Sequence, residues 1–225
     1  MRVLTALSAV VGFGLLVMPP LAAAPIPGLF TTGVDDSGNA LPLGSPDPHY
    51  TILETNTNPF VLTNIPPIYV DNSSTSQWIW QKPDGSPTGV TLKFRTTFNL
   101  TGFNPSTALI SGLWAADNVG VDILINGIST GNNIPGNGGD GFSAFDRFTN
   151  FSITEGFISG LNTLDFVVQD QGVISGFHVG EISGTATILE SEPVPEPTAT
   201  LGLLAFGTIG LGSALKKQSR VSPKA

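Results

Sequence analysis

The residues that most often carry out catalysis are few in this sequence. The 225 residues include no cysteine, and the two histidines, His49 and His178, lie far apart along the chain. No serine lies in a Gly-x-Ser-x-Gly elbow, and no glycine-rich phosphate loop opens a helix. A Ser-His-Asp triad can still assemble from distant residues. We therefore expect a protein that is not an enzyme, and an accessory glycoside hydrolase is the least favoured alternative.

One short segment offers oxygen ligands for a divalent cation. Asp35, Asp36 and Asn39 lie in "VDDSGN", and calcium prefers carboxylate and amide oxygens. The spacing does not match the twelve-residue EF-hand loop, and Asp, Ser, Gly and Asn are also the common turn residues. A simple turn is the favoured interpretation. We expect no cofactor, with a structural calcium ion as the alternative.

Carbohydrate binding would need an exposed aromatic ring beside hydrogen-bonding side chains. Trp78 and Trp80 in "SQWIWQ" are two residues apart, so in a strand they share a face. Asp117 and Asn118 follow an apolar stretch and complete the set of candidate ligand residues. An outward tryptophan pair beside Asp117 or Asn118 would favour sugar binding. An inward pair would favour a purely structural protein without a ligand.

The middle of the chain is strongly acidic. Residues 25–190 contain 15 Asp or Glu and 4 Lys or Arg, a net charge of −11. Such a surface repels phosphates, so we expect no nucleic acid partner. An acidic face can also attract divalent cations, but solubility is the simpler explanation.

The elements that must position these side chains are predicted to be strands. Alternating apolar residues occur in "TLKFRTTFNL", "VGVDILI" and "TLDFVVQDQ", and Asn126-Gly127 is a strong hairpin signal. The alternation also places Leu100 on the face of Phe98, and Val121 on the face of Ile123. The residues predicted to be buried between two sheets are Leu92, Phe94, Phe98, Ile123, Ile125, Leu164, Phe166 and Val168. No sustained helical periodicity is present between residues 25 and 190. We predict an all-β fold there, an antiparallel β-sandwich.

Two stretches within this region, "LWAADNVGVDILINGISTG" and "GLNTLDFVVQDQG", are similar to the galactose-binding-like jelly roll. The resemblance covers roughly residues 90–190. It implies a jelly-roll β-sandwich of the kind found in carbohydrate-binding modules, and it raises the expectation of a structural calcium ion. It transfers no binding site, because a fold alone does not define a function.

The start of the chain has the pattern of a secretory signal peptide. Arg2 precedes an apolar run over residues 3–18, and small residues follow it. We assign residues 1–24 to a signal helix removed by signal peptidase, with cleavage after Ala23 or Ala24. Without cysteines, the exported domain must be stabilised by its core alone.

The end of the chain, residues 191–225, has three distinct parts. A stiff polar motif comes first and consists of Val194, Pro195, Glu196 and Pro197. Residues 198–215 follow without a charge, and as a transmembrane helix they would be about 27 Å long, enough to cross a bilayer's hydrocarbon core. A basic cluster over residues 216–220 ends the pattern and consists of Lys216, Lys217 and Arg220. This cluster should stay on the cytoplasmic side.

This tail resembles the PEP-CTERM sorting signal of Gram-negative bacteria. The resemblance implies that an exosortase, a membrane-embedded cysteine transpeptidase, recognises residues 194–197, and that the basic cluster acts as the stop signal. It also implies secretion across the inner membrane to the cell envelope or extracellular matrix of a Gram-negative-type bacterium. Because the family is associated with biofilm, we expect a matrix role with exopolysaccharide as the candidate ligand.

Overall fold

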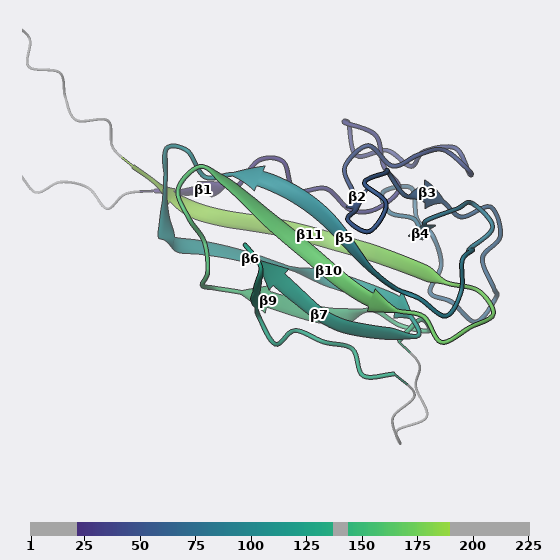
Figure 1. Cartoon of the computed structure of the whole chain (residues 1–225). Helices are drawn as coiled ribbons and strands as arrows, with labels where there is room; N and C mark the ends of the chain where they lie inside the picture. The colour runs from purple at the N-terminus through teal and green to yellow at the C-terminus, as the bar shows by residue number, and fades with distance from the viewer. Residues whose placement is uncertain (1–21, 137–143, 190–225) are drawn as a thin grey trace, which may run out of the picture. The chain divides into compact units, whose positions relative to one another are not determined.

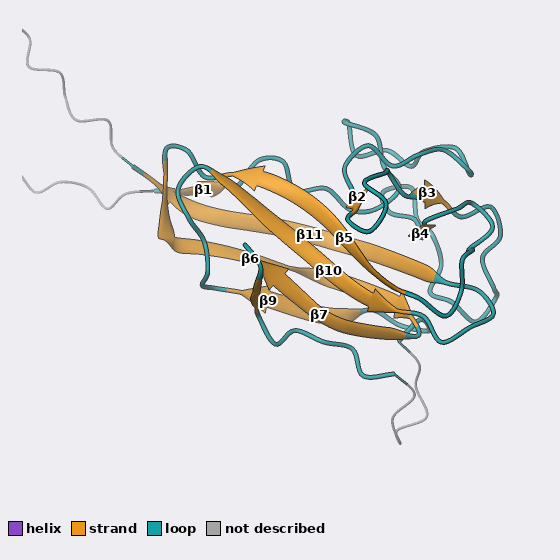
Figure 2. Cartoon of the chain, viewed as in Figure 1, coloured by secondary structure: helices purple, strands orange, loops and turns teal. Residues whose placement is uncertain are grey.

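The computed structural model describes residues 22–136 and 144–189 of the chain. Every regular element within these ranges is a strand, and none is a helix (Figure 2). The prediction of an all-β fold is therefore confirmed. Within the described residues no helix is long and apolar enough to cross a membrane. Residues 1–21 of the predicted signal helix, the sorting motif and the predicted transmembrane span lie outside them, whereas Ala23 and Ala24, assigned to the end of the signal helix, lie in a strand.

The strands form two antiparallel sheets that pack face to face as a β-sandwich (Figure 1). The six-stranded sheet contains, in order, β3 (Phe60–Val61), β4 (Ile79–Trp80), β11 (Gly176–Ile188), β6 (Phe103–Asp117) and β9 (Thr149–Ile153), with β1 (Ala23–Pro25) also paired to β11. The five-stranded sheet contains β2 (Thr51–Ile52), β5 (Thr91–Asn99), β10 (Leu161–Gln169), β7 (Val119–Ile125) and β8 (Ile128–Ser129).

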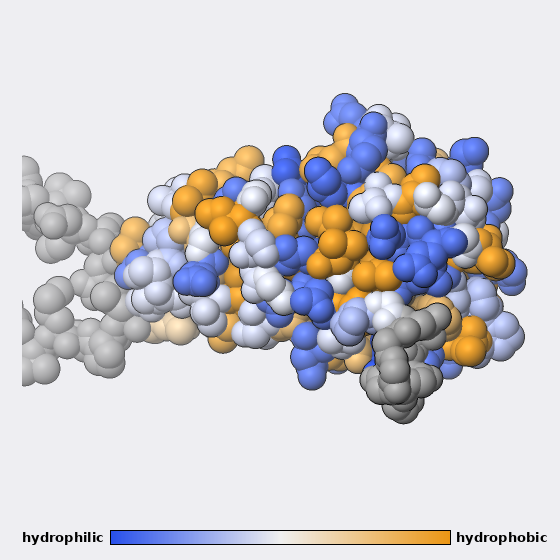
Figure 3. Space-filling model, turned by 60° about the horizontal axis from the view of Figure 1, so that its bottom comes forward, coloured by the Kyte–Doolittle hydropathy of each residue, from blue (hydrophilic) through white to orange (hydrophobic). Residues whose placement is uncertain are grey.

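The core between the sheets is rich in aromatic residues. The alternation read from the sequence holds for β5 and β10, whose predicted inward residues are all buried. Phe166 lies at the centre, with its ring centroid 5.0 Å from that of Phe177 and 5.6 Å from that of Trp114. Such ring pairs add to the stabilisation from buried apolar area. On the face shown in Figure 3, hydrophobic and hydrophilic residues are interspersed.

Val121 does not face the core, and this part of the prediction was wrong. The side chain is 43% exposed, because β7 contains a bulge opposite β10. Val167 pairs with Asp122 and Val168 with Gly120, which leaves Val121 as the extra residue. Gly120 faces the core in its place, where a Cβ atom would lie only 2.5 Å from Cη2 of Trp114.

The predicted hairpin between β7 and β8 is confirmed. Asn126 and Gly127 have φ angles of +51° and +80°, as a two-residue turn of this kind requires. The Asn126 side chain fixes the turn to the rest of the fold, because Nδ2 donates to the carbonyl of Gly156 and Oδ1 accepts from the backbone N–H of Thr163.

The described chain begins and ends at the same end of the sandwich (Figure 1). Ala23 pairs with Thr187, and the N–H of Ile188 donates to the carbonyl of Ala22. The predicted signal peptidase junction thus falls within β1. The opposite end carries the junction of β6 and β7 and the loop that precedes β11 (Figure 1).

A candidate binding cleft at one end of the sandwich

A cleft with a volume of about 320 Å³ lies at the end of the sandwich where β6 ends and β11 begins. We call it the loop-end cleft, and its main lining residues are Pro66, Tyr69, Asp117, Asn118, Phe145 and Val173. They come from four separate parts of the chain, so only the folded protein brings them together. The volume is at the small end of the range typical of ligand pockets.

Asp117 is the only acidic residue that lines this cleft within the described chain. Its side chain is 4% exposed. Oδ2 accepts a hydrogen bond from the Tyr69 hydroxyl, whereas Oδ1 has no hydrogen-bond partner among the described residues. Burial raises the pKa of Asp117 to about 6, and the nearby charge of Asp170 acts in the same direction, although the bond from Tyr69 opposes both.

Aromatic rings form one wall of the cleft. The Tyr69 ring stacks on Phe145, with ring centroids 5.0 Å apart and an interplanar angle of 27°. Trp78 lies against Tyr69 with a centroid distance of 4.7 Å, and its indole N–H donates to the carbonyl of Val70. Trp78 therefore supports the wall from within the core.

The loop between β10 and β11 forms the rim. Asp170 is 3% exposed; its Oδ2 accepts hydrogen bonds from the N–H groups of Gly89 and Gly172, and its Oδ1 has no partner among the described residues. Val173 has a φ of +83°, which is unfavourable for a β-branched residue, and its side chain is 91% exposed. Backbone outliers of this kind concentrate at functional sites.

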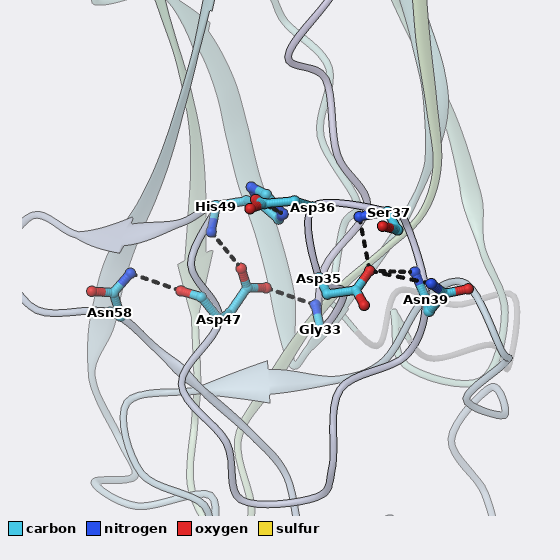
Figure 4. A network of polar contacts seen from close by, with 8 residues as sticks. All are labelled: Gly33, Asp35, Asp36, Ser37, Asn39, Asp47, His49 and Asn58. Carbon is cyan, nitrogen blue, oxygen red and sulfur yellow. Dashed lines mark hydrogen bonds and ion pairs between the residues drawn. The ribbon is translucent and has the colours of Figure 1, made fainter.

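The turn expected from "VDDSGN" is present, and the Asp35 carboxylate forms its hydrogen bonds within the turn (Figure 4). Oδ1 of Asp35 accepts hydrogen bonds from the N–H groups of Ser37 and Asn39, each at 2.9 Å, and these bonds lower the pKa of Asp35. Asp36 points towards His49, with 3.7 Å between Oδ1 and Nε2. Turn chemistry therefore accounts for this segment. Within the described ranges no group of three His, Cys, Asp or Glu side chains could hold a metal ion.

The two histidines are packing residues in different parts of the fold. The His49 ring stacks on Phe30 with a centroid distance of 3.6 Å, and the backbone N–H of His49 donates to the buried carboxylate of Asp47 (Figure 4). His178 is fully buried against Trp78, and burial lowers its pKa to about 3. The described structure thus gives neither imidazole the exposed position of a general base.

The four candidate ligand residues separate in the structure. Asp117 and Asn118 line the loop-end cleft, whereas Trp78 and Trp80 are fully buried. The indole N–H of Trp80 donates to the carbonyl of Pro87 at 2.9 Å. The tryptophan pair is therefore inward, and it offers no stacking platform to a sugar.

Sequence reasoning did not single out Tyr69 or Phe145 as parts of a site. No local pattern marks them, because Tyr69 meets Asp117 across 48 positions of the chain. A scan against models of protein families finds no match, and a search of curated proteins finds no significant match. Function therefore has to be inferred from the residues themselves.

Proposed function

We propose that the chain is a secreted, non-catalytic protein of the cell envelope or extracellular matrix that is sorted by an exosortase. Its β-sandwich, in this proposal a galactose-binding-like jelly roll, binds exopolysaccharide at the loop-end cleft. The sorting tail supports the location, and the cleft supports the binding. Both parts make predictions that can be tested separately.

The observation that carries the binding proposal is the free carboxylate oxygen of Asp117. A buried acceptor without a partner is unfavourable, and a ligand hydroxyl or N–H would satisfy it. Phe145 lines the same cleft and is only partly buried, so the part of its ring that is not stacked on Tyr69 suits the apolar face of a sugar. Sugar recognition uses this combination of rings and directed hydrogen bonds.

A structural protein without a ligand is the second candidate. The inward position of Trp78 and Trp80 favours it, because these residues stabilise the core and leave no aromatic platform on a sheet face. The two candidates differ in one respect that can be measured, which is whether the loop-end cleft binds a glycan.

A glycan array probed with the purified protein tests the binding. We expect at least one polysaccharide to bind, and the Tyr69→Ala and Asp117→Ala variants to bind at least about tenfold more weakly, since each loses a contact worth on the order of 1.4 kcal/mol. Glu181→Gln is the matched control, because Glu181 is an exposed carboxylate on β11 and does not line the cleft. Binding to no glycan would favour the structural candidate.

Mass spectrometry of the protein from cells tests the sorting. We expect the wild type to be shortened from its C-terminus and the Glu196→Ala variant to keep its full tail, because the two prolines hold Glu196 in an extended peptide suited to a protease cleft. Glu192→Ala serves as the control for loss of charge. Equal processing of all three proteins would reduce the tail to an ordinary membrane anchor.

A further inference from the structure

We propose that the loop-end cleft selects a saccharide with a free, protonated amine, so that its ligand is an amino sugar rather than a neutral or an acidic sugar. This inference rests on the proposed saccharide binding at the same cleft. It concerns the chemical class of the ligand, which neither the fold nor the sorting tail indicates.

The first argument is the charge of the cleft. Asp117 and Asp170 are both buried, and each has a carboxylate oxygen without a hydrogen-bond partner in the described part of the chain. The ionisable groups that act on Asp117 are Tyr69 and Asp170, and neither is a cation. Buried carboxylates normally have a cationic partner or a full set of donors. The cleft therefore lacks one positive charge that a ligand can supply.

The second argument is the kind of cation that fits. A calcium ion takes six to eight oxygen ligands, whereas the described lining of this cleft offers one free carboxylate oxygen, Oδ1 of Asp117, and an apolar wall. An ammonium group needs only about three acceptors and is also attracted to aromatic ring faces. Phe145, which is partly buried and lines the cleft with Asp117, supplies such a face. The cleft thus suits an ammonium group on an organic ring better than a bare divalent ion.

The third argument is the field around the cleft. Residues 25–190 carry a net charge of −11, which attracts a cationic polymer and repels one rich in carboxylates. Long-range attraction and the unpaired carboxylate oxygen of Asp117 therefore favour the same class of ligand. A polysaccharide with unacetylated amino groups has this charge, and its sugar rings can pack against Phe145.

Isothermal titration with matched oligosaccharides tests the inference. The probes are glucosamine oligomers, N-acetylglucosamine oligomers of the same length, and glucose oligomers, which differ mainly in the group on one ring carbon. At pH 7 we expect the glucosamine oligomers to bind at least about tenfold more tightly, since a charge-assisted hydrogen bond is roughly twice as strong as a neutral one. Asp117→Asn should abolish the preference, and Glu181→Gln should retain it.

A second measurement on the wild type does not depend on how the variant folds. The pKa of Asp117 is about 6, and Tyr69 and Asp170 are the ionisable groups that face it. Affinity for glucosamine oligomers should therefore fall as the pH is lowered from 6 to 4, because the carboxylate gains a proton while the amine, already largely protonated at pH 6, changes little. Binding of the acetylated oligomers should not show this fall.

The outcomes separate the two proposals. Equal binding of charged and acetylated oligomers, with a loss in Tyr69→Ala, would overturn the amine preference and leave saccharide binding intact. A flat pH profile for the glucosamine oligomers would also overturn the preference. If no glycan of any class binds, the proposed saccharide binding fails together with this inference.

Discussion

Asp117 should make the stability of the protein depend on pH in a defined way. Burial raises its pKa from 3.8 to about 6 in the folded protein. Between these two values the folded state holds a proton that the unfolded state has lost. The contribution of Asp117 therefore favours folding at low pH, decreases as the pH rises through this window, and is least favourable above about pH 6. Asp117→Asn removes the charge and keeps an oxygen that accepts from Tyr69.

The size of the effect follows from the difference between the two pKa values. About 6 minus 3.8 is 2.2, and one pKa step corresponds to about 1.36 kcal/mol, so the upper limit is about 3 kcal/mol. Asp117 lines an open cleft, where solvent screens part of its charge. We therefore expect the Asn variant to gain about 1–2 kcal/mol over wild type on going from pH 4 to pH 7.5.

Urea unfolding followed by tryptophan fluorescence measures this gain, because all three tryptophans are buried in the native state. The free energy of unfolding is determined for wild type and Asp117→Asn at several pH values, and the difference between them cancels other titrating groups. Glu181→Gln should show no comparable trend. A difference that is constant with pH, or one that turns against the Asn variant at pH 7.5, would refute the reasoning.

Three further substitutions test other features by the same unfolding measurement. Arg95→Ala removes the two-point ion pair to the buried Asp165, and the unpaired carboxylate should lower stability by about 2–4 kcal/mol. Gly120→Ala places a methyl group against Trp114 and should lower it by about 1–3 kcal/mol; no loss would contradict the bulge geometry. Val173→Gly relieves an unfavourable backbone conformation and should raise the free energy of unfolding by about 0.5–1 kcal/mol. This gain is smaller than the strain itself, roughly 1–2 kcal/mol, because glycine also makes the unfolded chain more flexible.

The parts of the fold that sequence predicts are those set by neighbouring residues. Strand β5 follows its alternation, because each inward residue is fixed by the one two positions away. The Asn126-Gly127 turn is equally local. The exposed position of Val121 could not be predicted in this way. The bulge depends on the register of β7 with β10 and on the space taken by Trp114, and the local sequence pattern indicates neither.

The candidate site was only half predictable for the same reason. Asp117 and Asn118 could be predicted as candidate ligand residues because they are polar and directly follow an apolar strand. The contact of Asp117 with Tyr69 depends on how distant loops meet at one end of the sandwich. For Trp78 and Trp80 the spacing predicts a shared face but cannot say whether that face is exposed. Both are buried by rings from distant parts of the chain: Trp78 packs against Tyr69 and His178, and Trp80 against Phe94.

The long pairing of β6 with β11 has a mechanical consequence. Asp117 pairs with Gly176 at the cleft end, and Phe103 pairs with Ile188 at the end where the chain continues towards its tail. The 15 residues of β6 span about 50 Å at roughly 3.4 Å per residue. A polymer pulling at the cleft on a protein held by its tail would load this ladder along the strands. The hydrogen bonds between β6 and β11 would then be loaded together in shear. They would not break one after another, as they do when the two strands of a hairpin are pulled apart from one end.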